Sequence, residues 1–350
     1  MSGLRKAYAF ADVLLVPKRS VLPSRAQADL STRLTRGLTL RLPIVSASMD
    51  TVTEARMAIA VGRLGGIGVI HRFTTPAAQA KMVKQAKRAG VAVGASVGVR
   101  PAELERAERL AEAGADVLVV DIAHGHGDNM GEMLEELAAR LPQAEVIAGN
   151  VASAEGVDFL ARHRNVGGVK VGIGPGSSCT TRVVTGFGVP QLTAILECAA
   201  AARRHGLPIV ADGGIDSGGA LVKALAAGAA TVMIGNLLAG TDESPGRVIT
   251  RRGARYKAFR GMASAAARRS RAAKVDESPQ LDTVSEEGVA GYVPYRGSAV
   301  AIVESLAAAL RSGLSYGGAR TIEELRENAE FLEITPAGLL ESRPHDVVLG

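Results

Sequence analysis

The sequence predicts a single closed (β/α)8 barrel, an α/β fold in which parallel strands alternate with helices. Short runs of β-branched residues alternate with amphipathic helical patterns, these runs number eight, and polar residues follow nearly all of them. A doubly wound open sheet also accommodates six to eight strands. We favour the barrel because no dinucleotide-binding fingerprint opens a helix after the first run.

The expected elements follow in chain order. The eight runs cover residues 43–46, 66–70, 92–97, 117–122, 145–148, 168–171, 208–211 and 231–234. Their length and apolar composition are typical of buried strands. The amphipathic segments between them cover residues 76–89, 101–113, 129–140, 155–164, 190–205 and 218–227. Two further helices are expected at 299–311 and 321–331.

The pattern changes between the eighth run and these last helices. Residues 263–285 are rich in Ala, Arg, Lys, Asp and Ser, contain Pro279, and show little apolar periodicity. This composition indicates a long mobile loop or lid, with a disordered surface insertion as the alternative.

Composition narrows the class of function. The chain has 350 residues, of which 47% are hydrophobic, so it can bury a large core. Its net charge is +6, but the basic residues are spread along the chain without interleaved aromatic residues. This argues against a nucleic-acid partner and fits either an anionic small substrate or a solvated basic surface. With two cysteines and no leader or membrane-spanning pattern, we expect a cytoplasmic protein without a membrane partner.

Polar residues gather where the runs end. They occupy 46–50, 71–72, 121–124, 149–150, 172–174, 212–214 and 235–236. In a barrel these ends meet at the C-terminal face, where such folds hold their active sites. The glycine-rich ends of the seventh and eighth runs fall where barrels commonly bind phosphate.

The sixth run opens a glycine-rich stretch, residues 168–189, that contains Cys179 among hydroxyls at 177, 178, 180 and 181. Glycines let backbone N–H groups approach an anion, and a thiol held there can attack an electrophilic carbon. A flexible loop with an incidental cysteine is the alternative. The second cysteine, Cys198, lies on an apolar helical face and is expected to be a core residue.

Motifs along nearly the whole chain follow one order. They read FADVLLVPKRS, SASMDTVTEARMA, GGIGVIHR, DIAHGHG, AGNV, VGIGPGSSCTTRVVTGFGVPQ, ADGGI, GNLLAGTDESPG, FRGMAS, EEGVAGYVPYRG, LRSGLSYGGA and ITPAGLLESRPHD. This series resembles the IMP dehydrogenase/GMP reductase family, whose fold is a (β/α)8 barrel. The resemblance implies an NAD(P)-dependent purine nucleotide oxidoreductase that assembles as a homotetramer.

Full-length IMP dehydrogenases usually carry a Bateman (CBS) regulatory domain after the second barrel helix. Here residues 81–89 run directly into 91–99. We therefore expect one catalytic domain over residues 1–350, with a flap insertion at 263–297 and no CBS domain.

The resemblance also assigns roles to residues. Cys179 attacks C2 of the purine, a hydride passes to the nicotinamide, and Thr181 positions water or ammonia. The implied substrate-binding residues are Ser46, Met49, Ser177, Asp212, Gly214, Gly235, Asn236, Gly261, Met262 and Glu287. Of these, Ser177 and the Gly214 and Gly235 backbones hold the phosphate, Asp212 the ribose, and Gly261, Met262 and Glu287 the purine edge. The implied cofactor-binding residues are Asp121, Ile122, Ala123, Asn150 and Gly172.

A monovalent cation, K⁺, is implied as well. Its ligands here are the backbone carbonyls of Gly174, Gly176 and Cys179, together with a neighbouring subunit's tail that matches Glu341, Ser342 and Arg343. Carbonyl oxygens suit a hard cation. This tail favours the dehydrogenase branch of the family.

The residues that separate the two branches are missing. Dehydrogenases carry an Arg-Tyr pair on the flap that activates water, whereas here Arg255-Tyr256 precedes the flap. Reductases carry a glutamate that acts on ammonia, and the matching residue is Ala265. Phe259 stands where a tyrosine usually contacts the phosphate, and Asn236 where serine is common, which implies modified phosphate contacts or a slightly different substrate.

From the DIAHGHG, EEGVAGYVPYRG and ITPAGLLESRPHD segments we predict NAD-dependent oxidation of IMP to XMP, with Arg268, Arg269 or Arg271 as the activating base. The segment PKRSVLPSR and the missing CBS domain favour the alternative, an NADPH-dependent GMP reductase that converts GMP to IMP. A nucleotide-binding paralogue with little turnover is the third hypothesis.

Overall fold

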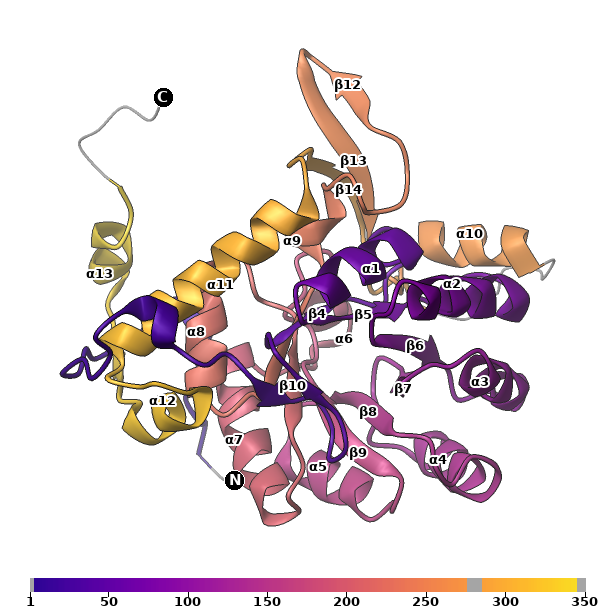
Figure 1. The fold of residues 1–350 in the computed structure, drawn as a ribbon, viewed down its shortest axis with the longest axis horizontal. Coiled ribbons are helices and arrows are strands. Elements are labelled where there is room, and N and C mark those ends of the chain that lie inside the picture. Colours follow the sequence, from indigo (N-terminus) through magenta and orange to yellow (C-terminus); the bar gives the residue numbers. More distant parts are fainter. Residues whose placement is uncertain (1–2, 276–284, 345–350) are drawn as a thin grey trace.

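The computed structural model describes residues 3–275 and 285–344. Eight parallel strands close into a barrel in the order β10-β11-β4-β5-β6-β7-β8-β9, with helices around it (Figure 1). The strands are β4 (Ile44–Ser46), β5 (Ile67–Ile70), β6 (Val93–Val97), β7 (Val117–Asp121), β8 (Val146–Val151), β9 (Val166–Val171), β10 (Ile209–Asp212) and β11 (Thr231–Ile234). The predicted barrel is confirmed, and each predicted run overlaps one of these strands.

Alternating side chains of each strand fill two separate cores. In β7, Val117 and Val119 belong to the cluster inside the barrel, whereas Leu118 and Val120 pack against the outer layer of helices. Both strand faces are therefore buried, which explains why the strands read as continuous apolar runs rather than as an alternation of apolar and polar residues.

The outer layer consists of α1 (Ala55–Arg63), α2 (Pro76–Arg88), α3 (Ala102–Glu112), α4 (Asp128–Arg140), α5 (Ala154–Ala161), α7 (Gln191–Arg204) and α8 (Gly218–Ala226). Several begin at a hydroxyl cap: Thr75 accepts the Ala78 N–H before α2, and Ser153 accepts the Gly156 N–H before α5. Only residues 89–92 separate α2 from β6.

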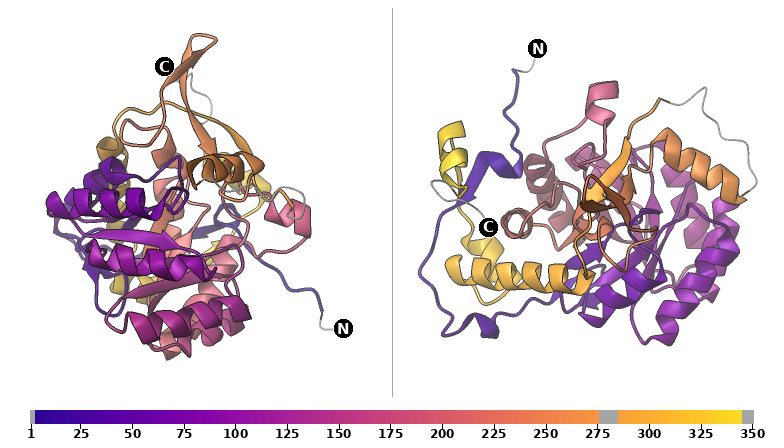
Figure 2. Two further views of the ribbon diagram at one scale, coloured as in Figure 1. Left: turned by 90° about the vertical axis from the view of Figure 1, so that its right-hand side faces the viewer. Right: turned by 90° about the horizontal axis from the view of Figure 1, so that it is seen from above.

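Other elements are added to the barrel. They are η1 (Phe10–Asp12), β1 (Val13–Leu15), η2 (Arg25–Gln27), β2 (Thr32–Arg33), β3 (Thr39–Leu40), α6 (Thr181–Thr185), α9 (Asn236–Ala239), β12 (Ile249–Arg251), β13 (Ala254–Arg260), α10 (Ala265–Val275), β14 (Ala290–Pro294), α11 (Ala299–Tyr316), α12 (Ile322–Asn328), β15 (Phe331–Glu333) and α13 (Pro336–Glu341). Strands β12, β13 and β14 form an antiparallel sheet that projects from the barrel at the top of Figure 1. In Figures 1 and 2, α10 and α13 lie on opposite sides of the molecule.

Two predictions about the last third of the chain are wrong in part. The segment 263–285 was expected as a loop, but α10 occupies residues 265–275 because Ala, Arg and Lys are strong helix formers and Ala267 and Ala272 are buried. Residues 276–284 of the predicted flap lie outside the described residues. The helix expected over 321–331 ends at Asn328, because Phe331–Glu333 pairs antiparallel with β1 instead.

Within the described part of the chain, no helix combines the length and the apolar character needed to span a membrane.

Candidate active site

The cysteine-containing loop leaves β9 and is fixed by one arginine. Arg182 donates from Nε to the Ile173 carbonyl at 3.3 Å and from Nη2 to the Val189 carbonyl at 2.5 Å. Gly174 has a φ of +85°, and a Cβ at this position would lie 2.5 Å from Cγ of Arg182. A larger residue is therefore excluded at Gly174 by both its conformation and its neighbour.

Cys179 lies half-buried at the end of this loop. Its Sγ is 3.1 Å from Oγ1 of Thr181, so the two residues predicted to be catalytic are brought into contact. The other cysteine, Cys198, is fully buried in α7, and burial raises the pKa of its thiol to about 12. Because the thiolate is the reactive form, burial disfavours reaction at Cys198, which is confirmed as a core residue, and Cys179 is the more accessible of the two thiols.

The end of the flap pairs with the cysteine loop. The Thr180 N–H donates to the Glu287 carbonyl at 3.1 Å, and the Val289 N–H donates to the Ser178 carbonyl at 2.9 Å. Gly261 packs against the same loop, since a Cβ there would lie 2.8 Å from the Ser178 carbonyl oxygen. The structure thus places Gly261 and Glu287, both predicted purine contacts, beside Cys179.

A buried lysine connects the predicted ribose and cofactor residues. Lys170 of β9 is 2% exposed, and its Nζ lies 2.9 Å from Asp121 and 2.5 Å from Asp212 and also contacts Asn150. Asn150 in turn donates to the Gly172 carbonyl at 2.7 Å and to Asp212 at 2.9 Å. The ends of β7, β8, β9 and β10 therefore form one polar centre.

Within this centre the surroundings of Asp121 favour its ionised form. Burial alone would raise the pKa of Asp121, but the Lys170 ammonium and the Ser48 hydroxyl, which donates to Asp121 at 2.6 Å, hold that pKa below its ordinary value. Burial alone would lower the pKa of Lys170, but Asp121 and Asp212 raise it. A carboxylate acts only as an acceptor, so Asp121 and Asp212 are suited to hydroxyl or amide donors.

Lys170 was not among the residues predicted from the sequence. The signal was nevertheless available, because a single lysine interrupts the apolar run of β9. Val169 and Val171 pack against the outer helices, so the two-residue period of a strand places Lys170 inside the barrel.

The predicted phosphate residues also converge. Asn236 Nδ2 donates to Oγ of Ser177 at 3.1 Å, and Arg296 donates to the Asn236 carbonyl at 2.6 Å and to its side-chain oxygen at 3.2 Å. A Cβ on Gly235 would lie 3.1 Å from Sδ of Met49, so Met49, another predicted substrate-binding residue, adjoins Gly235. Arg296 was missed because nothing in its local sequence distinguishes it from a solvated arginine.

The remaining predicted residues have these positions. Gly214 follows β10, and a Cβ there would contact Pro175 of the cysteine loop at 3.6 Å. Met262 and Ile122 are half-buried at the ends of their strands, and Ala123 is exposed. Ser46 is fully buried and its hydroxyl accepts from Thr53 at 2.9 Å, so a substrate contact of Ser46 stays a prediction.

Phe259, at the position where a tyrosine was expected to meet the phosphate, is 7% exposed and packs in the core. It offers no hydroxyl there. The other predicted phosphate residues, Ser177, Gly214 and Asn236, lie in the loops after β9, β10 and β11.

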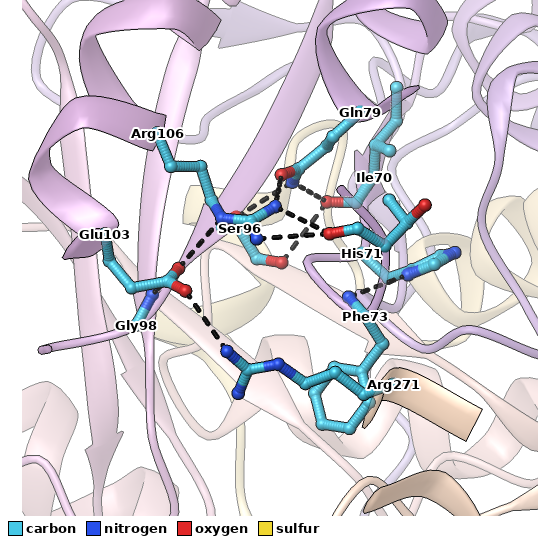
Figure 3. A network of polar contacts seen from close by, with 10 residues as sticks. Ile70, His71, Phe73, Gln79, Ser96, Gly98, Glu103, Arg106 and Arg271 are labelled. Atoms are coloured by element: carbon cyan, nitrogen blue, oxygen red, sulfur yellow. Dashed lines mark hydrogen bonds and ion pairs between the residues drawn. The ribbon is translucent and has the colours of Figure 1, made fainter. Parts of the chain in front are cut away.

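A second polar network lies above β5 and β6, where α10 meets the barrel (Figure 3). The carboxylate of Glu103, on α3, accepts the Gly98 N–H at 2.9 Å and lies 3.2 Å from Nε of Arg106. Arg271 of α10 approaches the same carboxylate at 3.6 Å, and its guanidinium lies 5.8 Å from the Phe73 ring centre. This network attaches the flap helix to the rim of the barrel.

The predicted cation ligands lie in two separate parts of the chain. The carbonyl of Gly176 accepts the Cys179 N–H at 3.0 Å, and Gly174 lies in the same loop. Glu341, Ser342 and Arg343 are exposed and adjoin α13, which is far from α6 and the cysteine loop within one chain (Figure 1). Among the described residues, no group of three or more His, Cys, Asp and Glu side chains is arranged to hold a metal ion.

Comparisons with known proteins agree on one family. A model described as the IMP dehydrogenase / GMP reductase domain matches residues 7–345. An inosine-5′-monophosphate dehydrogenase of Nitrosopumilus maritimus is 38% identical, with the alignment covering 99% of each chain. One of Aquifex aeolicus is 38% identical, over 98% of this chain and 96% of the relative. A GMP reductase variant from Trypanosoma brucei, solved in complex with guanosine 5′-monophosphate, has a TM-score of 0.94 at 33% identity and covers 99% of each chain.

Proposed function

The chain belongs to the IMP dehydrogenase/GMP reductase family and is an NAD(P)-dependent oxidoreductase, and on this basis we propose that it oxidises IMP to XMP with NAD. The observation that carries the proposal is the contact between Cys179 and Thr181 on a loop that the flap end covers. Its direction is supported by relatives named inosine-5′-monophosphate dehydrogenase at 37–38% identity.

The proposed reaction has two steps. The Cys179 thiolate adds to the electrophilic C2 of IMP, and a hydride with its electron pair leaves C2, which gives a covalent thioimidate. The bound nicotinamide supplies the acceptor for that hydride. Water then adds to C2 and the sulfur leaves as a thiol, giving XMP. Thr181, in contact with the thiol, positions the water.

The surrounding residues bind and orient. Ser177, Gly214, Gly235 and Asn236 hold the phosphate, and Asp212 accepts from the ribose hydroxyls. These groups fix C2 of the base opposite Cys179. Holding the reacting atoms in position in this way contributes strongly to the rate.

The cofactor side is built from the ends of β7, β8 and β9. Asp121 accepts from the nicotinamide riboside, with Ile122, Ala123, Asn150 and Gly172 around it. Lys170 lies between Asp121 and Asp212 and pairs with both, and so serves both halves of the site.

One structural observation favours GMP reduction as a second candidate. The carboxylate of Glu286 accepts the N–H of Ala265 at 2.8 Å, at the position that matches the missing reductase glutamate. The carbonyl of the same residue accepts the Thr180 hydroxyl at 3.3 Å. Glu286 thus links the start of α10 to the cysteine loop, and its carboxylate is the candidate for the proton carrier that release of ammonia from the GMP adduct requires.

The test measures both reactions, IMP oxidation and GMP reduction, on the purified protein. IMP with NAD should produce NADH and XMP, whereas NADPH consumption with GMP and ammonia release would establish the reductase instead. Cys179→Ala should abolish either reaction. Binding of IMP without turnover in either direction would leave a nucleotide-binding paralogue and overturn both candidates.

Glu286→Gln separates the two candidates further. If the protein is a dehydrogenase, this change should alter the rate less than about threefold, because water activation uses the flap arginines. If it is a reductase, loss of the proton carrier should lower kcat by about 100-fold. The neighbouring variant Glu287→Gln is the comparison, since it is expected to raise KM for the nucleotide in both cases.

We also infer a K⁺ site, a homotetramer, and a single catalytic domain without a CBS domain. The carbonyl oxygens of Gly174, Gly176 and Cys179 have the hard-donor chemistry that K⁺ requires. The tail residues Glu341 to Arg343 lie away from the cysteine loop of the same chain. A second copy of the chain is therefore needed to complete the cation site. The free thiol of Cys179 fits a reducing, cytoplasmic location.

A further inference from the structure

A buried ion pair joins the loop after β4 to the base of the flap. The side chain of Asp50 is fully buried, and its two carboxylate oxygens both accept from Nε of Arg260 at 3.1 Å. The Nη2 of Arg260 donates to Oδ2 of Asp50 at 2.5 Å and to Oγ of Ser270 at 3.0 Å. One guanidinium therefore connects a barrel loop, the end of β13 and the flap helix α10.

The sequence neighbours of the pair are both predicted substrate-binding residues. Asp50 follows Met49, whose sulfur faces Gly235, and Arg260 precedes Gly261, which packs against Ser178. The N–H of Gly261 donates to the Val289 carbonyl at 2.9 Å, so this residue is also held by the far end of the flap. The ion pair thus joins the chain segment next to Met49 to the segment next to Gly261.

The chemistry of the pair makes it a rigid spacer. A buried carboxylate without a counter-charge is strongly unfavourable, so Asp50 holds Arg260 in place. The planar fork of arginine offers two donors in fixed geometry, which a lysine ammonium cannot do. The pair sets the separation of the two loops more tightly than apolar packing would.

We propose that Asp50 and Arg260 are positioning residues that fix the distance between Met49 and Gly261, and so shape the slot for the purine base. This inference rests on the proposed function, because it assumes that a nucleotide base occupies the site. Neither residue touches the reacting atoms. Their effect should appear in nucleotide affinity rather than in the chemical step.

The test uses Arg260→Lys, which keeps the positive charge beside buried Asp50 but removes the fork. Arg252→Lys, in the exposed turn between β12 and β13, is the matched control. Arg260→Lys should weaken IMP and GMP binding, measured by calorimetry, about tenfold and raise KM similarly, while kcat at saturation changes less than about threefold. The control should bind as the wild type does. The melting temperature of both variants confirms that they fold.

A double-mutant cycle strengthens the test. Asp50→Asn and Arg260→Gln should each weaken binding, and the double variant should be no worse than the poorer single variant, because both remove one interaction. Additive losses, or wild-type affinity in Arg260→Lys, would overturn the inference. If the wild type itself binds neither IMP nor GMP, the proposed function fails first, so the two failures are distinguishable.

Discussion

A single buried lysine organises the centre of the site. Lys170 lies between Asp121 and Asp212, and Asn150 fills the remaining space around its ammonium. The interior of a barrel strongly disfavours isolated charges, so each of these groups depends on the others. The polar centre is therefore a structural unit.

Lys170→Met should destabilise the protein by about 3 kcal/mol, because it leaves Asp121 and Asp212 facing each other without a counter-charge. Urea unfolding at neutral pH measures the loss. Lys87→Met is the comparison, since Lys87 pairs with Asp116 on the surface and should cost less than about 1 kcal/mol. Equal losses in the two variants would contradict the role given to Lys170.

The pH dependence follows from the lowered pKa of Asp121. A carboxyl whose pKa is lower in the folded state contributes stability above its ordinary pKa of about 4, and loses it as the pH falls through the folded value. The wild type should therefore lose stability below about pH 4, and Lys170→Met should show a smaller loss over the same interval. The raised pKa of Lys170 causes no loss of stability until the pH exceeds the ordinary pKa of a lysine. Unfolding free energies between pH 3 and 7 measure both curves.

The flap has a helical part that is attached to the barrel rim. Helix α10 buries Ala267 and Ala272, and Arg271 reaches the Glu103 carboxylate, which Arg106 and the Gly98 N–H already hold (Figure 3). Because α10 buries few side chains, it is expected to be the least stable helix on this face.

Arg271→Ala should accelerate amide hydrogen exchange in α10 about fivefold, the effect of losing about 1 kcal/mol from one partly buried ion pair. Arg269→Ala, on the exposed side of the same helix, is the matched control and should leave exchange unchanged. Exchange followed by mass spectrometry resolves this segment from α2 and α3. Acceleration in α3 as well as α10 would indicate that Glu103, rather than the flap, had been disturbed.

At the scale of the whole molecule, the proposed cation site requires more than one chain. The loop at Gly174 and the tail at Glu341 lie apart within a single chain, so any joint site is made between copies (Figure 1). Activity should then depend on both the cation and assembly.

Replacing K⁺ with Li⁺ should lower kcat several-fold, because the smaller ion fits carbonyl ligands set for K⁺ poorly. A chain truncated after Leu340 should lose this difference between the two cations, while the binding of IMP is kept. Sedimentation before and after truncation separates loss of the cation from loss of assembly. A full-length protein that is equally active in both salts would contradict the proposed site.

The sequence determined the barrel and the location of its site. Eight apolar runs, the polar ends that follow them and the cysteine loop are all local patterns in the sequence. In a closed parallel barrel the ends of the strands meet on one face, so these patterns fix where the polar residues gather. The helix over 265–275 and the strand at Phe331–Glu333 were missed because their local composition also fits a loop or a longer helix.

Only the tertiary structure decided which side chains share a contact. Asp50 and Arg260 are 210 positions apart, Lys170 and Asp121 come from different strands, and Glu286 meets Ala265 across the flap. No periodicity in the sequence predicts such pairs, because their geometry depends on how the strands close into a barrel and where the flap packs against it. The sequence therefore specified the cysteine loop, while the fold determined which charged side chains surround it and how they are spaced.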